Sequence, residues 1–357
     1  MSLQLSESLY PVDEVVGTFI QCLLMNASLD ECLFWLWELI YTTPNICEGI
    51  VSIYQQFYSH TNSNVGRYVT RKLEDYCETG EKRHLADIVD NLRNLSSNPT
   101  AYYIVKYSQL NDVPDIIYKR RKWMRHYPSN MFCLLGSLNA CDVKNIGLYV
   151  ASSLRVNGFL KTRDALILYA SIKGKDIDTG LCDAMCDCDI ITLACLISKI
   201  MNRNELPKNK FARSNMDAVL KMESHFEKTP TRHYRNLTER RLYPTHSFLP
   251  PLNYGRFAVE HGFDNACRLH WEYYSFTSIE WNKHFNRCGG YLDHIKRQVV
   301  WSSDETMESF YNEGRCIDFD EQPIDAQTMS LHPIHVVDDP REWYESIILN
   351  KLSQLSI

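Results

Sequence analysis

Four cysteines that lie close together in the sequence could bind a metal ion. The thiols, with the carboxylates between them, are Cys182, Cys186, Cys188, Cys195, Asp183, Asp187 and Asp189. Structural zinc takes four thiolate or imidazole ligands in a tetrahedron, usually from CxxC pairs on tight turns. The spacing C-x3-C-x-C matches neither a zinc ribbon nor a common iron–sulfur motif. On a helix, Cys188 would point away from the face that Cys182 and Cys186 share. We therefore expect buried thiols at a helix start, with no metal and no cofactor.

A second group of metal-type side chains lies near the C-terminal end. It consists of His332, His335, Asp338 and Asp339. Pro333 excludes a helix that would align the two histidines, and no further ligand position is fixed. We therefore expect a surface tail here.

Motifs that build the common catalytic sites are absent from the sequence. There is no GxSxG nucleophile elbow, no GxxxxGK[ST] phosphate loop, no GxGxxG turn and no HExxH motif. Carboxylates are plentiful, but no spacing selects a pair for acid–base work. We predict that the protein is not an enzyme, and we assign no catalytic, cofactor-binding or metal-binding residue.

Basic residues gather in stretches that could contact a phosphate backbone. The densest stretch includes an aromatic side chain, Trp123, that could stack on a base. The candidate nucleic-acid contacts are Lys119, Arg120, Arg121, Lys122, Trp123, Arg125, Arg232, Arg235, Arg240 and Arg241. On a helix Arg121 aligns with Arg125, but the charges of the stretch as a whole circle the helix. Solvated faces, or pairing with the acidic C-terminal part, are the alternative explanation.

The charge of the chain is unevenly distributed. The formal net charge of the 357 residues is −6, so the chain as a whole is not a polycation. Basic residues outnumber acidic ones about two to one over residues 201–256, whereas the chain after Trp301 is strongly acidic. Such asymmetry is typical of a partner site or of two faces that attract each other.

The cysteine count bears on the cellular compartment. The chain has 13 cysteines, an odd number, and its first residues show no basic segment followed by an apolar core. We therefore expect no signal peptide and a cytoplasmic location. In that compartment the cysteines should be reduced thiols, many of them buried as small apolar residues.

The segment from Ser28 to Pro44 gives the strongest local prediction. Ser28 and Glu31 have the spacing of a capping box. From Cys32 to Tyr41 nearly every residue is apolar or aromatic, with Glu38 the clear exception. A helix that is apolar nearly all round must be covered on most sides, and this run is too short for a bilayer, which needs ~20 apolar residues. We expect a buried helix within a helical array and no membrane insertion.

Apolar residues recur at helical spacing through most of the chain. The predicted helices are one that Pro11 opens and Asn26 ends, Ser28–Pro44, and residues 46–58, 65–77, 82–95, 100–110, 131–139, 143–157, 163–173, 181–201, 214–228, 256–261, 265–276, 278–287, 291–299, 304–311 and 341–355. Helices of this length joined by short polar turns pack as antiparallel neighbours. We predict an all-α fold, an irregular antiparallel helical array or α-solenoid-like bundle. No repeat of fixed length supports a regular solenoid.

The predicted division has three parts. Residues 1–228 form the helical array, residues 229–255 a proline-containing extended linker, and residues 256–357 a smaller aromatic-rich helical region with an acidic tail. The last helix is amphipathic and could cap the array or bind a partner helix. Its candidate partner-binding residues are Trp343, Tyr344, Ile347 and Ile348.

Short islands of the sequence resemble a viral group of proteins. They are Asp30–Leu39 (DECLFWLWEL), His270–Tyr274 (HWEYY) and Asp320–Pro323 (DEQP). Together they resemble uncharacterised helical proteins of large nucleocytoplasmic DNA viruses, the giant viruses. The resemblance implies a viral product that acts in the host cytoplasm or is carried in the virion, and it brings no catalytic residues with it.

These observations lead to one functional hypothesis and two alternatives. The leading hypothesis is a non-enzymatic structural or scaffold protein that mediates protein–protein interactions. The first alternative is a nucleic-acid-associated factor that uses the basic stretches, and the second is a cryptic enzyme. The sequence leaves the protein partner and the oligomeric state open.

Overall fold

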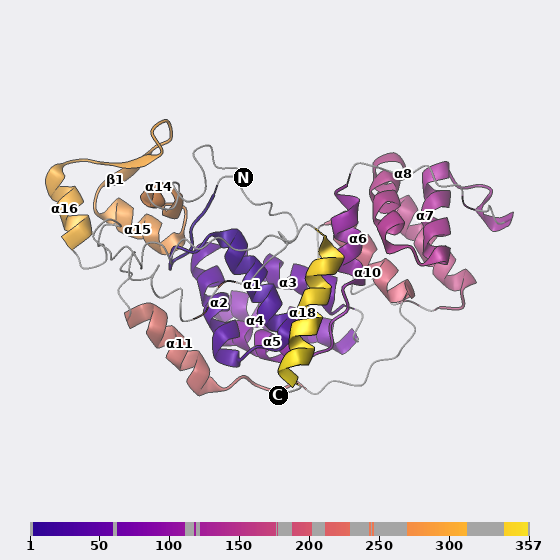
Figure 1. The fold of residues 1–357 in the computed structure, drawn as a ribbon, viewed down its shortest axis with the longest axis horizontal. Helices are drawn as coiled ribbons and strands as arrows, with labels where there is room; N and C mark the ends of the chain where they lie inside the picture. Colours follow the sequence, from indigo (N-terminus) through magenta and orange to yellow (C-terminus); the bar gives the residue numbers. More distant parts are fainter. Residues whose placement is uncertain are drawn as a thin grey trace. The chain divides into compact units, whose positions relative to one another are not determined.

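The computed structural model describes residues 3–59, 63–110, 118, 122–175, 177, 188–201, 211–228, 243, 245, 270–312 and 339–355. Helices make up most of this part of the chain, and its one sheet has two strands (Figure 1). The predicted all-α class is therefore confirmed, with a short hairpin as an addition.

The chain divides into two compact units. Unit 1 consists of residues 1–46 and 213–357, and unit 2 of residues 47–212, so unit 2 is inserted into the sequence of unit 1. This division differs from the predicted boundaries at residues 228 and 255. In unit 1, helix α11 (Met216–Lys228) packs against α2 (Leu29–Thr42), another helix of the predicted N-terminal array. The predicted linker lies outside the described residues, except for Tyr243 and Thr245.

Helix α2 is the buried helix that the sequence predicts. The hydroxyl of Ser28 caps it by accepting the backbone N–H of Glu31 (3.2 Å). Trp35 and Trp37 are fully buried within it. Besides α11, α2 packs against α1 (Val12–Met25) and α15 (Ile279–Arg287), so several elements cover its apolar surface.

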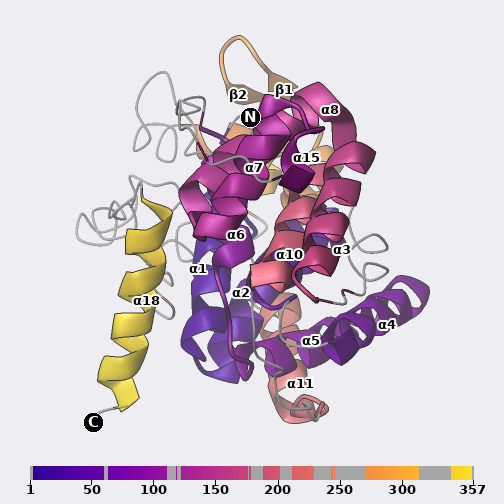
Figure 2. The same ribbon diagram turned by 90° about the vertical axis from the view of Figure 1, so that its right-hand side faces the viewer.

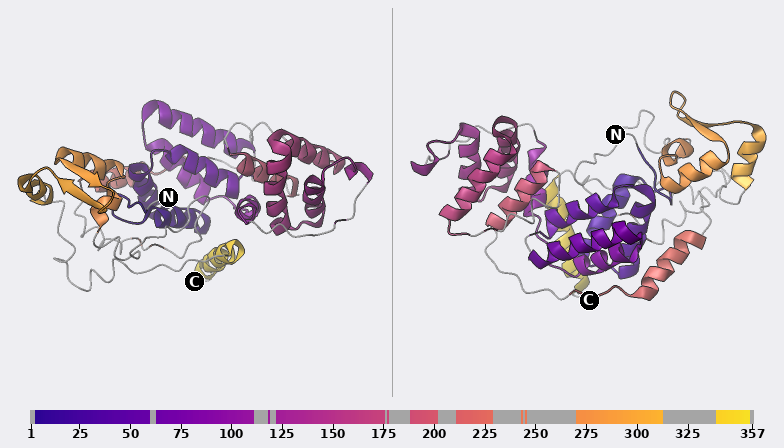
Figure 3. Two further views of the ribbon diagram at one scale, coloured as in Figure 1. Left: turned by 90° about the horizontal axis from the view of Figure 1, so that it is seen from above. Right: turned by 180° about the vertical axis from the view of Figure 1, so that it is seen from behind.

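The C-terminal part of unit 1 surrounds an aromatic cluster. The elements around the cluster are α14 (Trp271–Ser275), α15, α16 (Asp304–Asn312) and the antiparallel strands β1 (Gly290–Asp293) and β2 (Gln298–Trp301) (Figure 3). The N-terminal arm, residues 3–11, joins this cluster by burying Leu3, Leu5 and Leu9 in it. Rings and aliphatic side chains from both ends of the chain therefore form one core.

The predicted helix over residues 291–299 is wrong, because this segment forms the β-hairpin. Gly289 adopts a left-handed conformation (φ 74°) directly after α15, which ends the helix. The carboxylate of Asp293 then accepts the backbone N–H groups of Ile295 (2.8 Å) and Lys296 (3.0 Å). Such local side-chain hydrogen bonds offer the backbone an alternative to a helix, and here they close the turn.

Unit 2 contains a helical core formed by α6 (Thr100–Ser108), α7 (Ser129–Ala140), α8 (Val143–Ile172) and α10 (Asp189–Met201) (Figure 2). Helix α8 packs against the other three, and α6 also packs against α10. Helix α8 is interrupted at Gly158 (φ 77°, ψ 170°), between the two helices predicted over residues 143–157 and 163–173.

The remaining described α-helices of unit 2 are α3 (Ile46–Phe57), α4 (Ser63–Thr79) and α5 (Arg83–Arg93). Gly80 has φ +72°, and its backbone N–H donates to the carbonyl of Tyr76 (2.8 Å). Glycine enters this left-handed conformation without steric cost, which lets the chain leave α4 and turn into α5. Helices α4 and α5 pack against each other as a helical hairpin.

Glu38 lies fully buried in α2, amid apolar neighbours. Its Oε2 accepts the backbone N–H of Ser8 (3.2 Å) from the N-terminal arm. Burial raises the pKa of Glu38, although hydrogen bonds from Ser6 and Ser8 oppose the rise. The exception noted in the sequence is therefore a carboxyl that fixes the arm against α2 and that favours its protonated form.

We expect Glu38→Gln to increase the free energy of unfolding at pH 7. The folded state holds the Glu38 proton more tightly than the unfolded chain, so wild-type stability falls as the pH rises from about 4.5 through the raised folded pKa. Glutamine stays neutral throughout, and its carbonyl can still accept the Ser8 N–H. Urea unfolding from pH 4 to pH 8 should show the two curves separating with rising pH. Glu308→Gln, at an exposed position of α16, is the matched control and should follow wild type.

Candidate functional site

Polar residues face each other in pairs along the α4–α5 hairpin. The pairs are Tyr68 with Asn91, Lys72 with Asp87, and Asp75 with His84. Residues three and four apart share a helix face, and the two helices run antiparallel, so these pairs form successive rungs. We call the six residues the polar seam.

The central rung of the polar seam is an ion pair. The Nζ of Lys72 lies 2.7 Å from Oδ2 of Asp87, whose side chain is fully buried, while that of Lys72 is 20% exposed. At the rung nearest the turn, the imidazole of His84 lies 3.7 Å from the carboxylates of both Asp75 and Glu81. Since a buried carboxylate is costly without its partner, the Lys72–Asp87 pair holds the two helices in one register.

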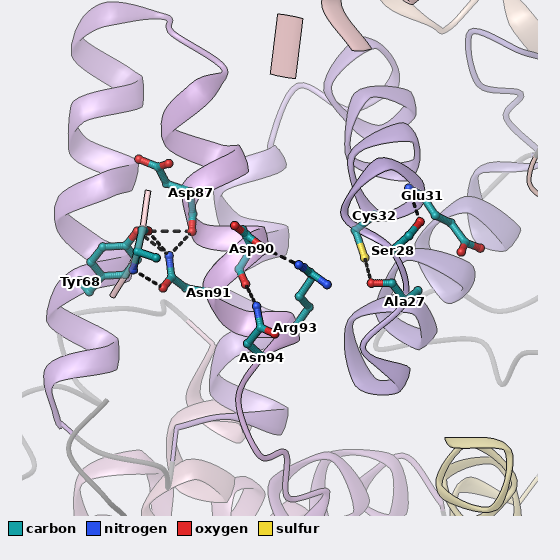
Figure 4. A network of polar contacts seen from close by, with 11 residues as sticks. Ala27, Ser28, Glu31, Cys32, Tyr68, Asp87, Asp90, Asn91, Arg93 and Asn94 are labelled. Atoms are coloured by element: carbon teal, nitrogen blue, oxygen red, sulfur yellow. Dashed lines mark hydrogen bonds and ion pairs between the residues drawn. The ribbon is translucent and has the colours of Figure 1, made fainter. Parts of the chain in front are cut away.

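The rung farthest from the turn is a hydrogen-bond network (Figure 4). The Nδ2 of Asn91 lies 2.7 Å from the carbonyl oxygen of Asp87 and 3.0 Å from the hydroxyl of Tyr68. That hydroxyl donates to the same carbonyl (3.3 Å). Burial raises the pKa of Tyr68, and the negative charges of Asp87 and Asp90 raise it further, so the hydroxyl stays protonated at neutral pH.

This last rung holds a segment from far along the chain. The backbone N–H of Ala212 donates to Oδ1 of Asn91 (2.9 Å), and Nδ2 of Asn91 donates to the carbonyl of Ala212 (2.7 Å). The ring of Phe211 stacks on that of Tyr68, with centroids 4.2 Å apart and planes 3° apart. We call Tyr68 and Asn91 the docking site, and Phe211-Ala212 the docked segment.

The geometry explains what the docking site can recognise. In an extended chain the N–H and C=O of one residue point to the same side, so one side-chain amide can bond both. Those hydrogen bonds involve only the backbone of the bound residue, so they do not depend on its side chain. The stacked ring supplies the side-chain preference, for an aromatic residue directly before the clamped one.

The structure describes part of the predicted nucleic-acid stretch. Lys122 and Trp123 lie in a short 3₁₀ helix, η1 (Lys122–Met124), and Arg125 lies in the turn after it. Lys122 and Arg125 are exposed. Trp123, however, packs against the core of unit 2, with its ring 6.1 Å from that of Tyr169. The other candidates lie outside the described residues, namely Lys119, Arg120, Arg121, Arg232, Arg235, Arg240 and Arg241.

The predicted partner-binding residues lie on α18 (Pro340–Leu355), which packs against α1 within unit 1. Trp343, Tyr344 and Ile347 are buried there, and Ile348 is partly buried. This face of α18 is therefore covered within unit 1. Of our two alternatives, a cap and a partner-binding helix, their burial fits the cap.

The cysteine and histidine groups are only partly described. Cys195 is buried in α10 and Cys188 is exposed just before it, whereas Cys182 and Cys186 lie outside the described residues. The same holds for His332, His335 and Asp338, while Asp339 accepts the backbone N–H of Arg341 (2.7 Å) at the start of α18. Among the described residues, no three His, Cys, Asp or Glu side chains are placed to hold a metal ion.

Sequence reasoning missed the polar seam and the docking site. The available signal was a mirrored spacing: Tyr68, Lys72 and Asp75 are separated by four and three residues, and His84, Asp87 and Asn91 by three and four. Across an antiparallel hairpin such spacings bring the residues face to face. None of the helices in the described ranges combines the length and apolar character that crossing a membrane requires. No protein-family model, curated protein or solved structure matches the chain.

Proposed function

We propose that this protein is a non-enzymatic scaffold that binds other proteins, and that the docking site on α4 and α5 takes extended segments of their chains. The observation that carries the proposal is the double hydrogen bond of Asn91 to the backbone of Ala212, beside the stacked Phe211 ring. A main-chain clamp next to an aromatic platform is a general way to bind a peptide. In the structure the chain's own segment occupies it.

The strength of these contacts suits an exchangeable segment. A hydrogen bond contributes about 0.5–1.5 kcal/mol net, and an aromatic pair about 0.5–1.5 kcal/mol beyond burial. The docked segment is therefore held by a few kcal/mol, helped by its tether, which gives it a high effective concentration. A partner segment with an aromatic residue and further contacts of its own can compete with it.

The cellular setting is part of the same proposal. The resemblance of residues Asp30–Leu39 and His270–Tyr274 to helical proteins of giant viruses supports a role in the infected cytoplasm or in the particle. The nucleic-acid alternative receives less support, because Trp123 is engaged in the core of unit 2.

A peptide added in trans tests the docking site. Ala212→Pro removes the N–H that donates to Asn91 and should release the docked segment. We expect a fluorescein-labelled peptide of residues 207–216 to bind this variant at least ten times more tightly than wild type, measured by fluorescence anisotropy. In wild type the tethered copy of the segment competes with the peptide.

Two modified peptides serve as controls without altering the protein. Methylation of the peptide nitrogen at Ala212 removes the clamped N–H, and Phe211→Ala removes the stacked ring. Each should weaken binding to the Ala212→Pro variant about tenfold, since a tenfold change corresponds to about 1.4 kcal/mol. Equal binding of all three peptides, or no binding of the unmodified one, would contradict a docking site of this chemistry.

A further inference from the structure

Two cysteines of unit 2 lie side by side, although 30 residues separate them in sequence. Cys47 is in the first turn of α3 and Cys77 in the last turn of α4, and their sulfur atoms are 3.9 Å apart. Cys77 is exposed and Cys47 is partly exposed. A disulfide needs a sulfur–sulfur distance of about 2.05 Å, so the two sulfur atoms must move closer together for the bond to form.

The two thiols differ in their surroundings. Burial, the hydrogen bond to Cys77 and the charges of Cys77 and Glu48 together raise the pKa of Cys47 to about 11, with burial the largest cause. Cys47 is therefore almost entirely a thiol at neutral pH, and thiolates are the attacking species in exchange reactions. The exposed Cys77 is the one that a soluble disulfide reaches first, with Cys47 placed to attack second.

We propose that Cys47 and Cys77 form a redox modification site that exchanges with the disulfides of small thiols, such as oxidised glutathione. The proposal is independent of the docking site.

The reaction has two exchange steps. The Cys77 thiolate attacks one sulfur of oxidised glutathione, forming a mixed disulfide and expelling one glutathione thiolate. Cys47 then loses its proton as its sulfur attacks Sγ of Cys77, which expels the second glutathione thiolate. The protein loses two electrons and two protons, and one oxidised glutathione becomes two glutathione thiols. An excess of reduced glutathione reverses both steps.

The product would join the start of α3 to the end of α4. It closes the loop between residues 47 and 77 and restricts the unfolded chain, so the oxidised form should unfold at a higher temperature than the reduced form. A Cys77→Ser variant should show no such difference between oxidising and reducing buffers.

Peptide mapping of the full-length protein tests the site directly. After incubation with oxidised glutathione, acid quenching and alkylation of free thiols, cleavage at glutamates gives residues 39–48 and 75–78 as the peptides with the two cysteines. We expect these peptides to be joined in wild type and separate after treatment with reduced glutathione. In Cys47→Ser, Cys77 should instead retain one glutathione.

Cys141, an exposed thiol at the end of α7, is an internal control that should take glutathione as a mixed disulfide. Two results would overturn the proposal. One is Cys77 of wild type retaining glutathione as the Cys47→Ser variant does. The other is both cysteines remaining free while Cys141 is modified.

Discussion

Replacement of Lys72 by methionine should lower the free energy of unfolding of unit 2 by about 3–5 kcal/mol, the usual loss when one partner of a buried ion pair is removed. The Asp87 carboxylate is fully buried, and the Lys72 ammonium is 2.7 Å from it. Methionine keeps most of the apolar stem of lysine, so packing is largely preserved and the charge is what disappears. The carboxylate would then lie in a medium that disfavours it.

Hydrogen exchange of the amides in α4 and α5 is the measurement, because it reports on this hairpin whether or not the whole chain unfolds in one step. Arg71→Met, one residue earlier and exposed, is the matched control and should stay within about 0.5 kcal/mol of wild type. Adding Asp87→Leu to Lys72→Met should recover much of the loss, since it also removes the buried carboxylate. If the amides of α4 and α5 exchange as slowly in the Lys72→Met variant as in the Arg71→Met variant, the polar seam does not stabilise the hairpin.

The second large effect should come from Trp281→Ala, which we expect to lower the free energy of unfolding of unit 1 by about 3–5 kcal/mol. Trp281 is 2% exposed and lies in the aromatic cluster, with its ring 5.5 Å from that of Trp271. Its indole N–H donates to the carbonyl of Glu7 (3.0 Å). Alanine therefore opens a cavity in the core and also frees the N-terminal arm.

Amide exchange and limited proteolysis of residues 3–10 measure this effect. The arm should become cleavable in Trp281→Ala, because the cluster that buries Leu5 and Leu9 loses a large aromatic side chain and the arm loses its hydrogen bond from Trp281. Trp281→Phe is the informative control, since it keeps an aromatic ring while it loses the hydrogen bond, worth about 1 kcal/mol, and part of the ring volume. An arm that remains protected in Trp281→Ala would show that Trp281 does not anchor it.

Where local signals agreed, the sequence predicted the helices well. Helix α2 combined a capping residue with a continuous apolar run, and it lies where we expected it. The hairpin after Gly289 was missed because its apolar residues also fit a helical period. The segment forms a hairpin and not a helix because the Asp293 carboxylate closes a turn between the two strands.

The burial of Asp87 and the contact of the docking site with Ala212 could not be predicted in the same way. A buried Asp87 and an exposed aspartate look identical in a sequence, because both sit between apolar positions of an amphipathic helix. Asn91 and Ala212 meet across 121 residues, and no periodicity encodes such a contact. Likewise, the sequence shows the apolar stripe of α18, but it does not show that α1 covers this stripe.

The insertion of unit 2 into the sequence of unit 1 has a consequence for synthesis on the ribosome. Helices α1 and α2 emerge early, whereas α11 and α15, which pack against α2, follow only after residues 47–212. At ~5–20 residues per second, that interval lasts roughly 10–30 seconds. During it Phe34 and Tyr41 of α2 lack the ring of Phe226 in α11 that packs against them, so we expect chaperones that bind apolar surface to bind the nascent N-terminal helices.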